Sequence, residues 1–292
     1  MGDKARWGNE FFNFGTGNHE NGGYIASTIG TNLESLITDL QNTGCDTWTP
    51  LAESYYVAMQ YFKQEDVDTN LSWAYPNNAI PHSNDIQDPY YDGNDFVYCA
   101  KSFVILLTDG ASTKDQVVPD NLKNYDNDTH ETDRTYSYEG SDYLDDIALY
   151  ARTNDLRSDL QGDQNLILYT IYAFGNEDNA RTLLQDAARN GGFEDKNGNH
   201  IPDQQAEWDE NNDGVPDTYF EAQDGYQLEA KLLQAINDIL KRAASGTSVS
   251  VLATRGQGEG TITQAYFRAS VPEGLREVKW TCLLYTSPSP RD

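Results

Sequence analysis

The sequence predicts an α/β fold built on an open, doubly wound and mostly parallel sheet. Two apolar runs, 103–107 and 165–174, have the length and continuity of strands that are buried on both faces. Stretches with helical periodicity follow them, so strands and helices alternate along the chain. In such sheets ligands bind beyond the carboxyl ends of the strands, and Asp109 follows the first of these runs.

The segments before residue 103 predict two short strands and two helices. Residues 5–14 are rich in aromatic side chains, and 23–29 form a shorter strand-like run. Asn32 begins one helix, and Pro50 stands where the first turn of another tolerates proline. Residues 65–98 are polar and rich in turn formers, which predicts a long surface loop. The apolar stripes of the two helices are Leu33, Leu36, Ile37 and Leu40, and Leu51, Tyr55, Ala58, Met59 and Phe62.

The segments after residue 107 continue the alternation. Gly191 and Gly192 provide a helix stop, and paired carboxylates such as Asp145 and Asp146 are interpreted as a solvated helix face. The expected elements are helices at 141–156, 178–192 and 226–244 and strands at 165–174 and 218–222.

Three regions follow from this pattern. Residues 1–244 form the α/β domain, with an acidic insertion at 194–218. Residues 245–281 alternate like strands around a glycine-rich turn and predict the start of a β-rich domain. Residues 282–292 resemble a translated adaptor tail, so we interpret them as non-native and exclude them from the fold.

The composition excludes several classes of function. Acidic residues number 47 and basic residues 20, and a net charge of −27 argues against nucleic acid and anionic membranes as partners. No apolar run is long enough to span a bilayer. Three cysteines rule out a cysteine-rich zinc site. Cys45 and Cys99 are expected at opposite ends of a strand about 17–20 Å long, too far apart for a disulfide.

Two acidic segments, 195–203 and 209–217, have the spacing of calcium-binding loops. Both carry oxygen-bearing side chains at positions 1, 3, 5 and 9, as in the first part of an EF-hand loop. Position 6, which needs a positive φ, is Gly214 in the second loop and His200 in the first. The alternative is a solvated acidic loop. The predicted Ca²⁺ ligands are Asp195, Asn197, Asn199, the Ile201 carbonyl, Asp203 and Glu207 over 195–207, and Asp209, Asn211, Asp213, the Val215 carbonyl, Asp217 and Glu221 over 209–221.

Thr49 and Asp109 form a second candidate metal site. The strand that ends in T-D-G and the T-P-L helix start resemble a von Willebrand factor type A domain. In that family a divalent ion, usually Mg²⁺, is held by a D-x-S-x-S loop, a threonine and the T-D-G aspartate. Thr49 and Asp109 match the last two, whereas the D-x-S-x-S loop would precede residue 1. We therefore expect Mg²⁺ or another divalent ion there only with the upstream loop restored. The alternative is that Asp109 caps a turn and Thr49 merely precedes a helix.

Four stretches together resemble PilY-type proteins, the tip-associated adhesins and assembly factors of bacterial type IV pili. They are residues 47–56, 99–115, 143–175 and 197–254. The resemblance implies that 1–244 is a von Willebrand type A region lacking its first central strand, in a fragment of a longer chain. It also implies a non-enzymatic protein of the pilus and outer cell surface, with a signal peptide upstream of this fragment. Implied partners are minor pilins, other pilus components and host or surface ligands.

Two expectations can be tested further. In the family, the strands at 5–14 and at 103–107 flank the missing strand, so a gap or an improvised pairing is expected between them. The alternative function is an intracellular von Willebrand type A module of an ATP-driven, chelatase-like complex. Weak calcium loops load at the millimolar Ca²⁺ found outside cells, which favours the surface protein.

Overall fold

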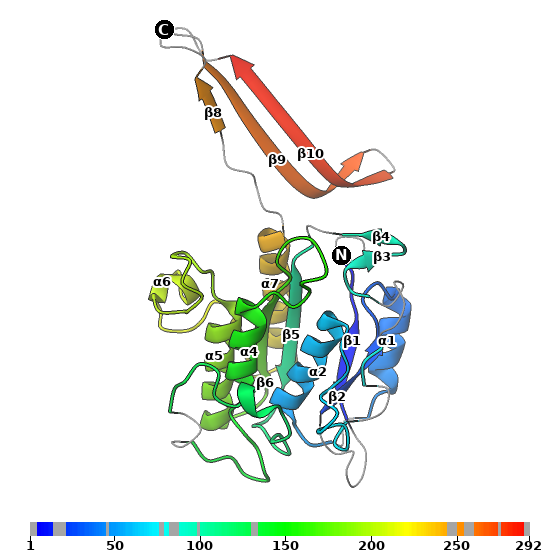
Figure 1. Ribbon diagram of the computed structural model, residues 1–292, viewed down its shortest axis with the longest axis vertical. Helices are drawn as coiled ribbons and strands as arrows, with labels where there is room; N and C mark the ends of the chain where they lie inside the picture. Colours follow the sequence, from blue (N-terminus) through cyan, green and yellow to red (C-terminus); the bar gives the residue numbers. More distant parts are fainter. Residues whose placement is uncertain are drawn as a thin grey trace. The chain divides into compact units, whose positions relative to one another are not determined.

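The computed structural model describes residues 5–13, 22–44, 47–75, 79–81, 88–97, 100–129, 134–243, 250–253, 260–273 and 276–288, with side chains up to residue 243. The chain divides into two compact units (Figure 1). The main unit is Arg6–Ala235, and the smaller one contains the chain from Ile236 onward. Cys45 and Cys99 lie outside the described residues.

A three-stranded parallel sheet is the centre of the main unit. Its order is β5 (Ser102–Thr108), β6 (Leu166–Ala173), β7 (Tyr219–Ala222). The β5–β6 ladder runs from Ser102 opposite Leu166 to Thr108 opposite Tyr172. All eight residues of β6 are buried, as expected of an apolar strand with neighbours on both sides. The predicted α/β class with parallel strands is confirmed.

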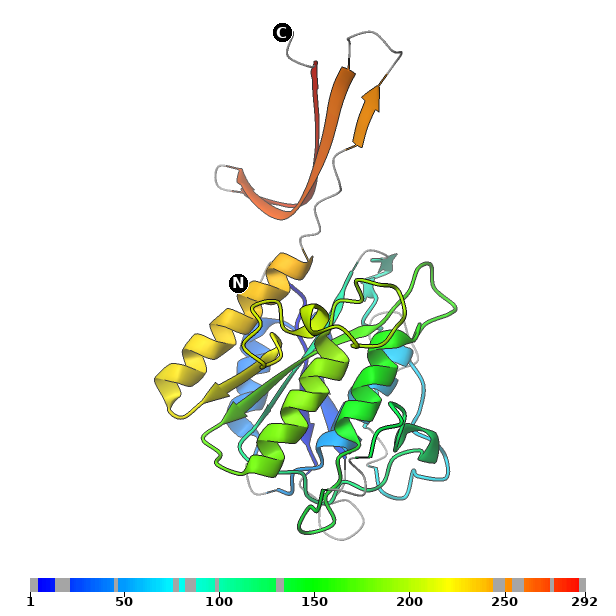
Figure 2. The same cartoon turned by 90° about the vertical axis from the view of Figure 1, so that its left-hand side faces the viewer.

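Helices lie on both sides of this sheet. α4 (Leu144–Thr153) and α5 (Asp178–Gly192) cover one face, and the first part of α7 (Gly225–Ala243) lies on the other (Figure 2). Lys231 of α7 places Nζ 6.0 Å from the centre of the Phe220 ring. Two shorter helices, η1 (Asp120–Leu122) and α6 (Gln205–Trp208), belong to the connections.

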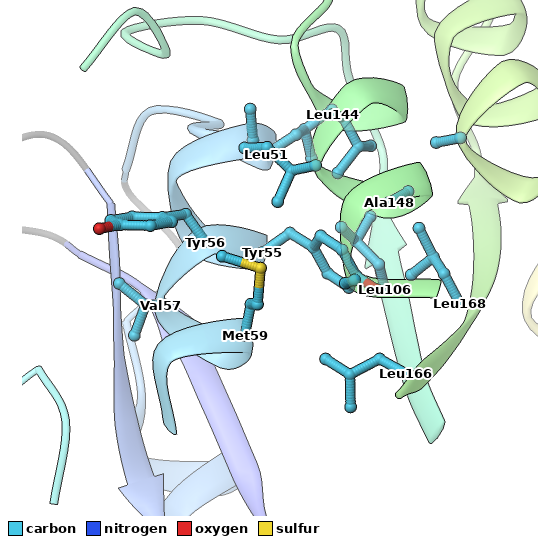
Figure 3. Packing of buried hydrophobic residues seen from close by; sticks show 14 of the residues in the cluster. Leu51, Tyr55, Tyr56, Val57, Met59, Leu106, Leu144, Ala148, Leu166 and Leu168 are labelled. Atoms are coloured by element: carbon cyan, nitrogen blue, oxygen red, sulfur yellow. The ribbon is translucent and has the colours of Figure 1, made fainter. Parts of the chain in front are cut away.

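The core forms where α2 (Leu51–Lys63) packs against α4 and the sheet (Figure 3). Tyr55 and Met59 point from α2 toward Leu106, Leu166 and Leu168 of the strands. Burial of an aliphatic or aromatic side chain stabilises a fold by about 1.5–3 kcal/mol. The predicted stripe of α2 is buried as expected; its members are Leu51, Tyr55, Ala58, Met59 and Phe62.

A second, separate sheet pairs β1 (Asn9–Phe12) antiparallel with β2 (Gly23–Ser27). Within the described residues no ladder joins β1 to β5, so the improvised pairing that was one of the two expected outcomes is not seen there. β5 is consequently an edge strand, and Leu107 is 43% exposed. The prediction that β5 is buried on both faces was wrong, because an apolar run does not report which neighbouring strands are present.

α1 (Leu33–Asn42) begins where the sequence predicts. Asn32 is its N-cap and accepts a hydrogen bond from the Ser35 backbone N–H at 3.0 Å. Leu36 is buried, whereas the other members of the predicted stripe, Leu33, Ile37 and Leu40, are exposed. The segment expected to be a loop, 65–98, contains a short hairpin of β3 (Tyr91–Asp92) and β4 (Asp95–Phe96).

The smaller unit contains an antiparallel sheet ordered β10-β9-β8, which agrees with the predicted β-rich character. β8 is Ser250–Ala253, β9 is Gly260–Glu273 and β10 is Arg276–Pro288. β10 pairs with β9 up to Pro288 opposite Thr261, so it includes residues that we excluded from the fold. Among the described helices, none combines the length and the apolar character needed to cross a membrane.

Candidate metal sites

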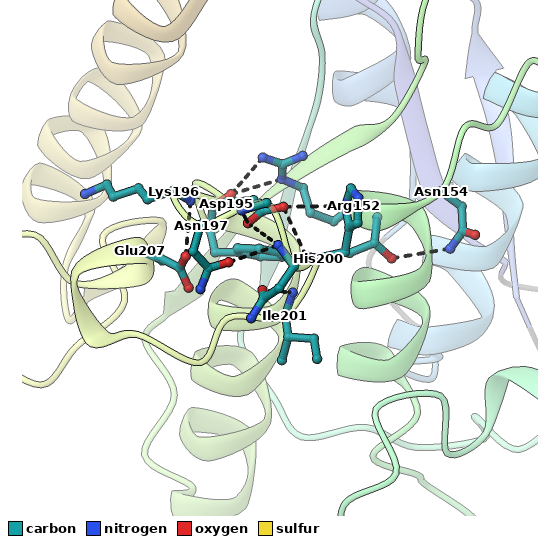
Figure 4. Close-up of polar contacts among 12 residues, drawn as sticks. Arg152, Asn154, Asp195, Lys196, Asn197, His200, Ile201 and Glu207 are labelled. Carbon is teal, nitrogen blue, oxygen red and sulfur yellow. Dashed lines mark hydrogen bonds and ion pairs between the residues drawn. The ribbon is translucent and has the colours of Figure 1, made fainter.

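The first acidic loop folds around the carboxylate of Asp195 (Figure 4). Asp195 Oδ1 accepts the backbone N–H of Gly198 at 2.7 Å, and Oδ2 accepts that of His200 at 3.1 Å. Asn197 and Asn199 donate their side-chain amides to the two oxygens of Asp203, at 2.9 and 3.0 Å. The structure therefore brings positions 1, 3, 5 and 9 of this loop together.

The second loop repeats the contacts of the position-1 carboxylate, whereas Asp217 at position 9 accepts the backbone N–H of Glu210 at 2.9 Å. Asp209 Oδ1 accepts the backbone N–H of Asp213 at 3.1 Å, and Oδ2 accepts that of Gly214 at 2.7 Å. In both loops the side chain at position 3 accepts from the N–H at position 5, and the side chain at position 5 accepts from position 7. These pairs are Asn197–Asn199, Asn199–Ile201, Asn211–Asp213 and Asp213–Val215, at 2.8–2.9 Å. The two copies thus share their local contacts as well as their spacing.

The backbone also repeats between the loops. Positions 4 and 6 have positive φ in both, with values of 77° at Gly198, 61° at His200, 59° at Asn212 and 85° at Gly214. Only glycine adopts such angles without steric cost. His200 therefore holds a conformation that Gly214 adopts freely, as the sequence predicts.

Hydrogen bonds keep the first carboxylate of each loop ionised. Partial burial alone would raise the pKa of Asp195, but N–H groups of His200 and Gly198 lower it overall. Burial likewise opposes ionisation of Asp209, and donors from Gln205 and the loop backbone lower its pKa below the ordinary value. Both positions are therefore anionic near neutral pH, as a cation site requires.

The two glutamates predicted to complete the shells lie in different surroundings. Glu207 is buried at the end of the first loop and accepts the backbone N–H groups of Lys196 and Gln204, at 3.1 and 3.2 Å. Glu221 lies in β7, where Arg181 donates to both of its oxygens at 3.0 and 3.1 Å. Ligation by Glu221 would require it to release Arg181.

Thr49 lies near the turn that follows β5, and this turn contains Asp109. The backbones of Thr49 and Thr113 are joined, with Thr49 N–H donating to Thr113 Oγ1 at 2.8 Å and Thr113 N–H to the Thr49 carbonyl at 3.0 Å. A Cβ atom on Gly110, next to the exposed Asp109, would lie 4.0 Å from Thr49 Oγ1. The predicted pair of residues therefore shares one small region of the surface.

A family model described as "PilY1 homolog, second domain" matches residues 9–157 of this chain, which is half of its length. This chain belongs to the PilY1-homolog family. The predicted PilY-type membership is confirmed, and the match indicates a function related to type IV pili. No curated protein and no solved structure matches the chain.

The PilY1-homolog match has two further consequences. The matched span contains α2, β5 and α4, and with them Thr49 and Asp109, whereas the acidic insertion follows it. Proteins of this family are generally non-enzymatic and associated with pili. Nothing in the comparisons supports the alternative of an intracellular, chelatase-like module.

A buried carboxylate pair that the sequence analysis missed lies within the PilY1-homolog span. Asp115 and Glu53 are both fully buried at the start of α2. Asp115 accepts backbone N–H groups of Ala52 and Glu53, and Glu53 Oε1 accepts that of Val117, at 2.7 Å. Among the described residues, Glu53 Oε2 has no hydrogen-bond partner. Burial, reinforced by the charge of Asp115, raises the pKa of Glu53 to about 9, so the pair's proton resides on Glu53.

We expect Glu53→Gln to raise the free energy of unfolding at alkaline pH. The ordinary pKa of this group is 4.5, so between about pH 4.5 and 9 the folded chain holds a proton that the unfolded chain releases. Stability of the unsubstituted chain therefore falls as pH rises through this window, by at most about 1.4 kcal/mol per pH unit from this group. Urea denaturation at pH 5, 7 and 9 measures the difference. An equal effect of Glu53→Gln at all three values would contradict the assignment.

The sequence analysis also misinterpreted Asp145 and Asp146. Both lie in the first turn of α4 and are 3% and 1% exposed, so they do not form a solvated face. α5 and the segment 125–128 cover them: Asp146 Oδ1 accepts the N–H of Asp126 at 3.1 Å, and Asn190 of α5 donates to the Asp145 carbonyl at 3.4 Å. Both covering segments lie outside α4 in the sequence, so the periodicity of α4 alone could not predict that they bury these two side chains.

Proposed function

We propose that this chain is a non-enzymatic, cell-surface module of a type IV pilus biogenesis and adhesion protein that binds Ca²⁺ through its two acidic loops. The observation that carries the proposal is the repetition of one set of contacts and one pattern of positive φ in both loops. Ca²⁺ prefers oxygen ligands in flexible loops, and both loops offer them at positions 1, 3, 5 and 9.

The charge of the insertion supports a cation. Residues 194–224 carry ten acidic side chains against Lys196 alone. Without a cation these carboxylates repel one another at short range. Ca²⁺ would supply the missing attraction, and loops with this few carboxylates bind at about 10⁻⁴ M, which suits an extracellular protein.

The Thr49–Asp109 region would serve as the adhesion site. The proximity of Thr49 to the turn after β5 supports a von Willebrand type A arrangement in which these two residues help to hold Mg²⁺. That site would need a D-x-S-x-S loop upstream of residue 1 and a strand between β1 and β5. Its partners would be minor pilins, other pilus components and host or surface ligands.

Calorimetric titration of the 292-residue chain with CaCl₂ tests the loop proposal. The second loop has Asp213 at position 5 and Gly214 at position 6, where the first has Asn199 and His200, so it should bind more tightly. Asp213→Ala should remove the tighter loop event, and Asp195→Ala only the weaker one.

A matched control is available within the second loop. Glu210 is exposed at position 2, which supplies no ligand in this type of loop, so Glu210→Ala should leave both events in place. Absence of binding heat from the loops, or the same loss from Asp213→Ala and Asp195→Ala, would refute the proposal.

A further inference from the structure

Three carboxylates meet far from the acidic loops, between α4 and the connection that follows β5. Asp126 and Asp128 belong to that connection, and Asp145 lies in the first turn of α4. One carboxylate oxygen from each residue lies within 4.8 Å of the other two. Carboxylates gathered in this way repel one another unless a proton or a cation lies between them.

Asp145 provides the independent indication of a ligand. The residue is only 3% exposed, and within the described part of the chain no hydrogen bond or ion pair reaches its carboxylate. A buried charge without a partner costs several kcal/mol in a folded protein. Burial holds the pKa of Asp145 well above its ordinary value, and the nearby carboxylates of Asp146, Asp126, Asp186 and Asp128 raise it further.

The loop carboxylates are held in place by other contacts. Asp126 Oδ1 accepts the N–H of Asp128 at 3.1 Å, and its Oδ2 accepts Nδ2 of Asn190 at 2.9 Å. Asn127 between them has a φ of 58°, which turns the chain so that both carboxylates face the same region. Asp126 and Asp128 are each half-buried, which leaves room for water as a further ligand.

We propose that Asp126, Asp128 and Asp145 form a third Ca²⁺ site, which joins α4 to the connection carrying Asp109. Ca²⁺ lies 2.3–2.6 Å from its ligands, so two oxygens on opposite sides of the ion are separated by about 4.6–5.2 Å. For Mg²⁺ the corresponding separation is only about 4.0–4.2 Å. Oxygens that all lie within 4.8 Å of one another can contact a single ion, and carboxylates with access for water are the ligand set that Ca²⁺ takes. The site is independent of the two acidic loops, because no residue is shared between them.

The test uses the full chain with both loops disabled by Asp195→Ala and Asp213→Ala. Calorimetry with CaCl₂ should still detect one bound ion, and adding Asp145→Asn should weaken that event at least tenfold. Asp128→Asn, on the half-buried loop, should have a similar effect. Asp120→Asn removes one charge from an exposed side chain of the same connection and should change nothing.

Thermal unfolding in EDTA checks that the variants fold. Asp145→Asn removes a buried charge, so the unfolding temperature of this variant in EDTA should be no lower than that of the loop-disabled chain. Added CaCl₂ should raise the unfolding temperature of the loop-disabled chain but not that of the Asp145→Asn variant. Failure of the loop-disabled chain to bind Ca²⁺, retention of binding by Asp145→Asn, or tighter binding of MgCl₂ would each overturn the third site. If the loop proposal were wrong, the titration would give a different result. The loop-disabled chain would then bind the same amount of Ca²⁺ as the unsubstituted chain.

Discussion

Asp115→Ala is expected to lower the free energy of unfolding by about 3–5 kcal/mol. The fully buried Asp115 carboxylate accepts the backbone N–H groups of Ala52 at 3.0 Å and Glu53 at 2.9 Å, and the hydroxyl of Ser112 at 2.7 Å. It thereby caps α2 from the connection that follows β5. Losing a helix cap costs about 0.5–2 kcal/mol, and each buried donor left unpaired adds about 1–3 kcal/mol.

Urea denaturation at pH 7 measures this effect, and two variants provide the scale. Asp115→Asn keeps one acceptor oxygen, so its loss should be smaller. Asp120→Ala removes an exposed carboxylate from the same connection and should stay within about 0.5 kcal/mol of the parent chain. If Asp115→Ala were as mild as Asp120→Ala, the cap would have no role in stability. Thr49 and Thr113 are hydrogen-bonded to each other close in sequence to Ala52 and Asp115, so loss of the cap should also disturb the Thr49–Asp109 region.

Gly192→Ala should destabilise the chain by about 1–3 kcal/mol through overpacking at the base of the acidic insertion. A Cβ atom on Gly192 would lie 2.0 Å from Oγ1, 2.8 Å from Cγ2 and 2.9 Å from Cβ of Thr218. Rotation of the Thr218 side chain about χ1 does not move its Cβ atom, which would still lie 2.9 Å away, so no rotamer relieves the clash fully. Thr218 also donates to the Ala188 carbonyl at 3.1 Å, a bond that would be displaced.

Thermal unfolding followed by circular dichroism tests this prediction. Gly225→Ala is the matched control, because a Cβ atom there meets nothing within 4 Å. An unchanged unfolding temperature for Gly192→Ala would show that the α5 end and residue 218 can separate freely. Since Gly192 and Thr218 flank the insertion that carries both loops, the substitution should also weaken Ca²⁺ binding there.

Local sequence patterns were sufficient for much of this fold. The apolar runs predict the neighbouring parallel strands β5 and β6, and the spacing of Leu51, Tyr55 and Met59 predicts the buried side of α2. The loops at 195–203 and 209–217 were also visible, because their contacts join residues at most seven positions apart. Interactions within such short segments depend on residue types and spacing alone.

Only the tertiary structure decided which carboxylates are buried. Asp145 and Asp146 look like solvent-facing helix residues until α5 and the segment 125–128 cover them. Asp115 reaches Glu53 across 62 positions, and Glu221 reaches Arg181 across 40. The same holds for β5, whose edge is exposed because no ladder to β1 forms among the residues that the structure describes. Burial and charge pairing arise from segments that meet only after folding, and the periodicity of one segment carries no information about its neighbours in space.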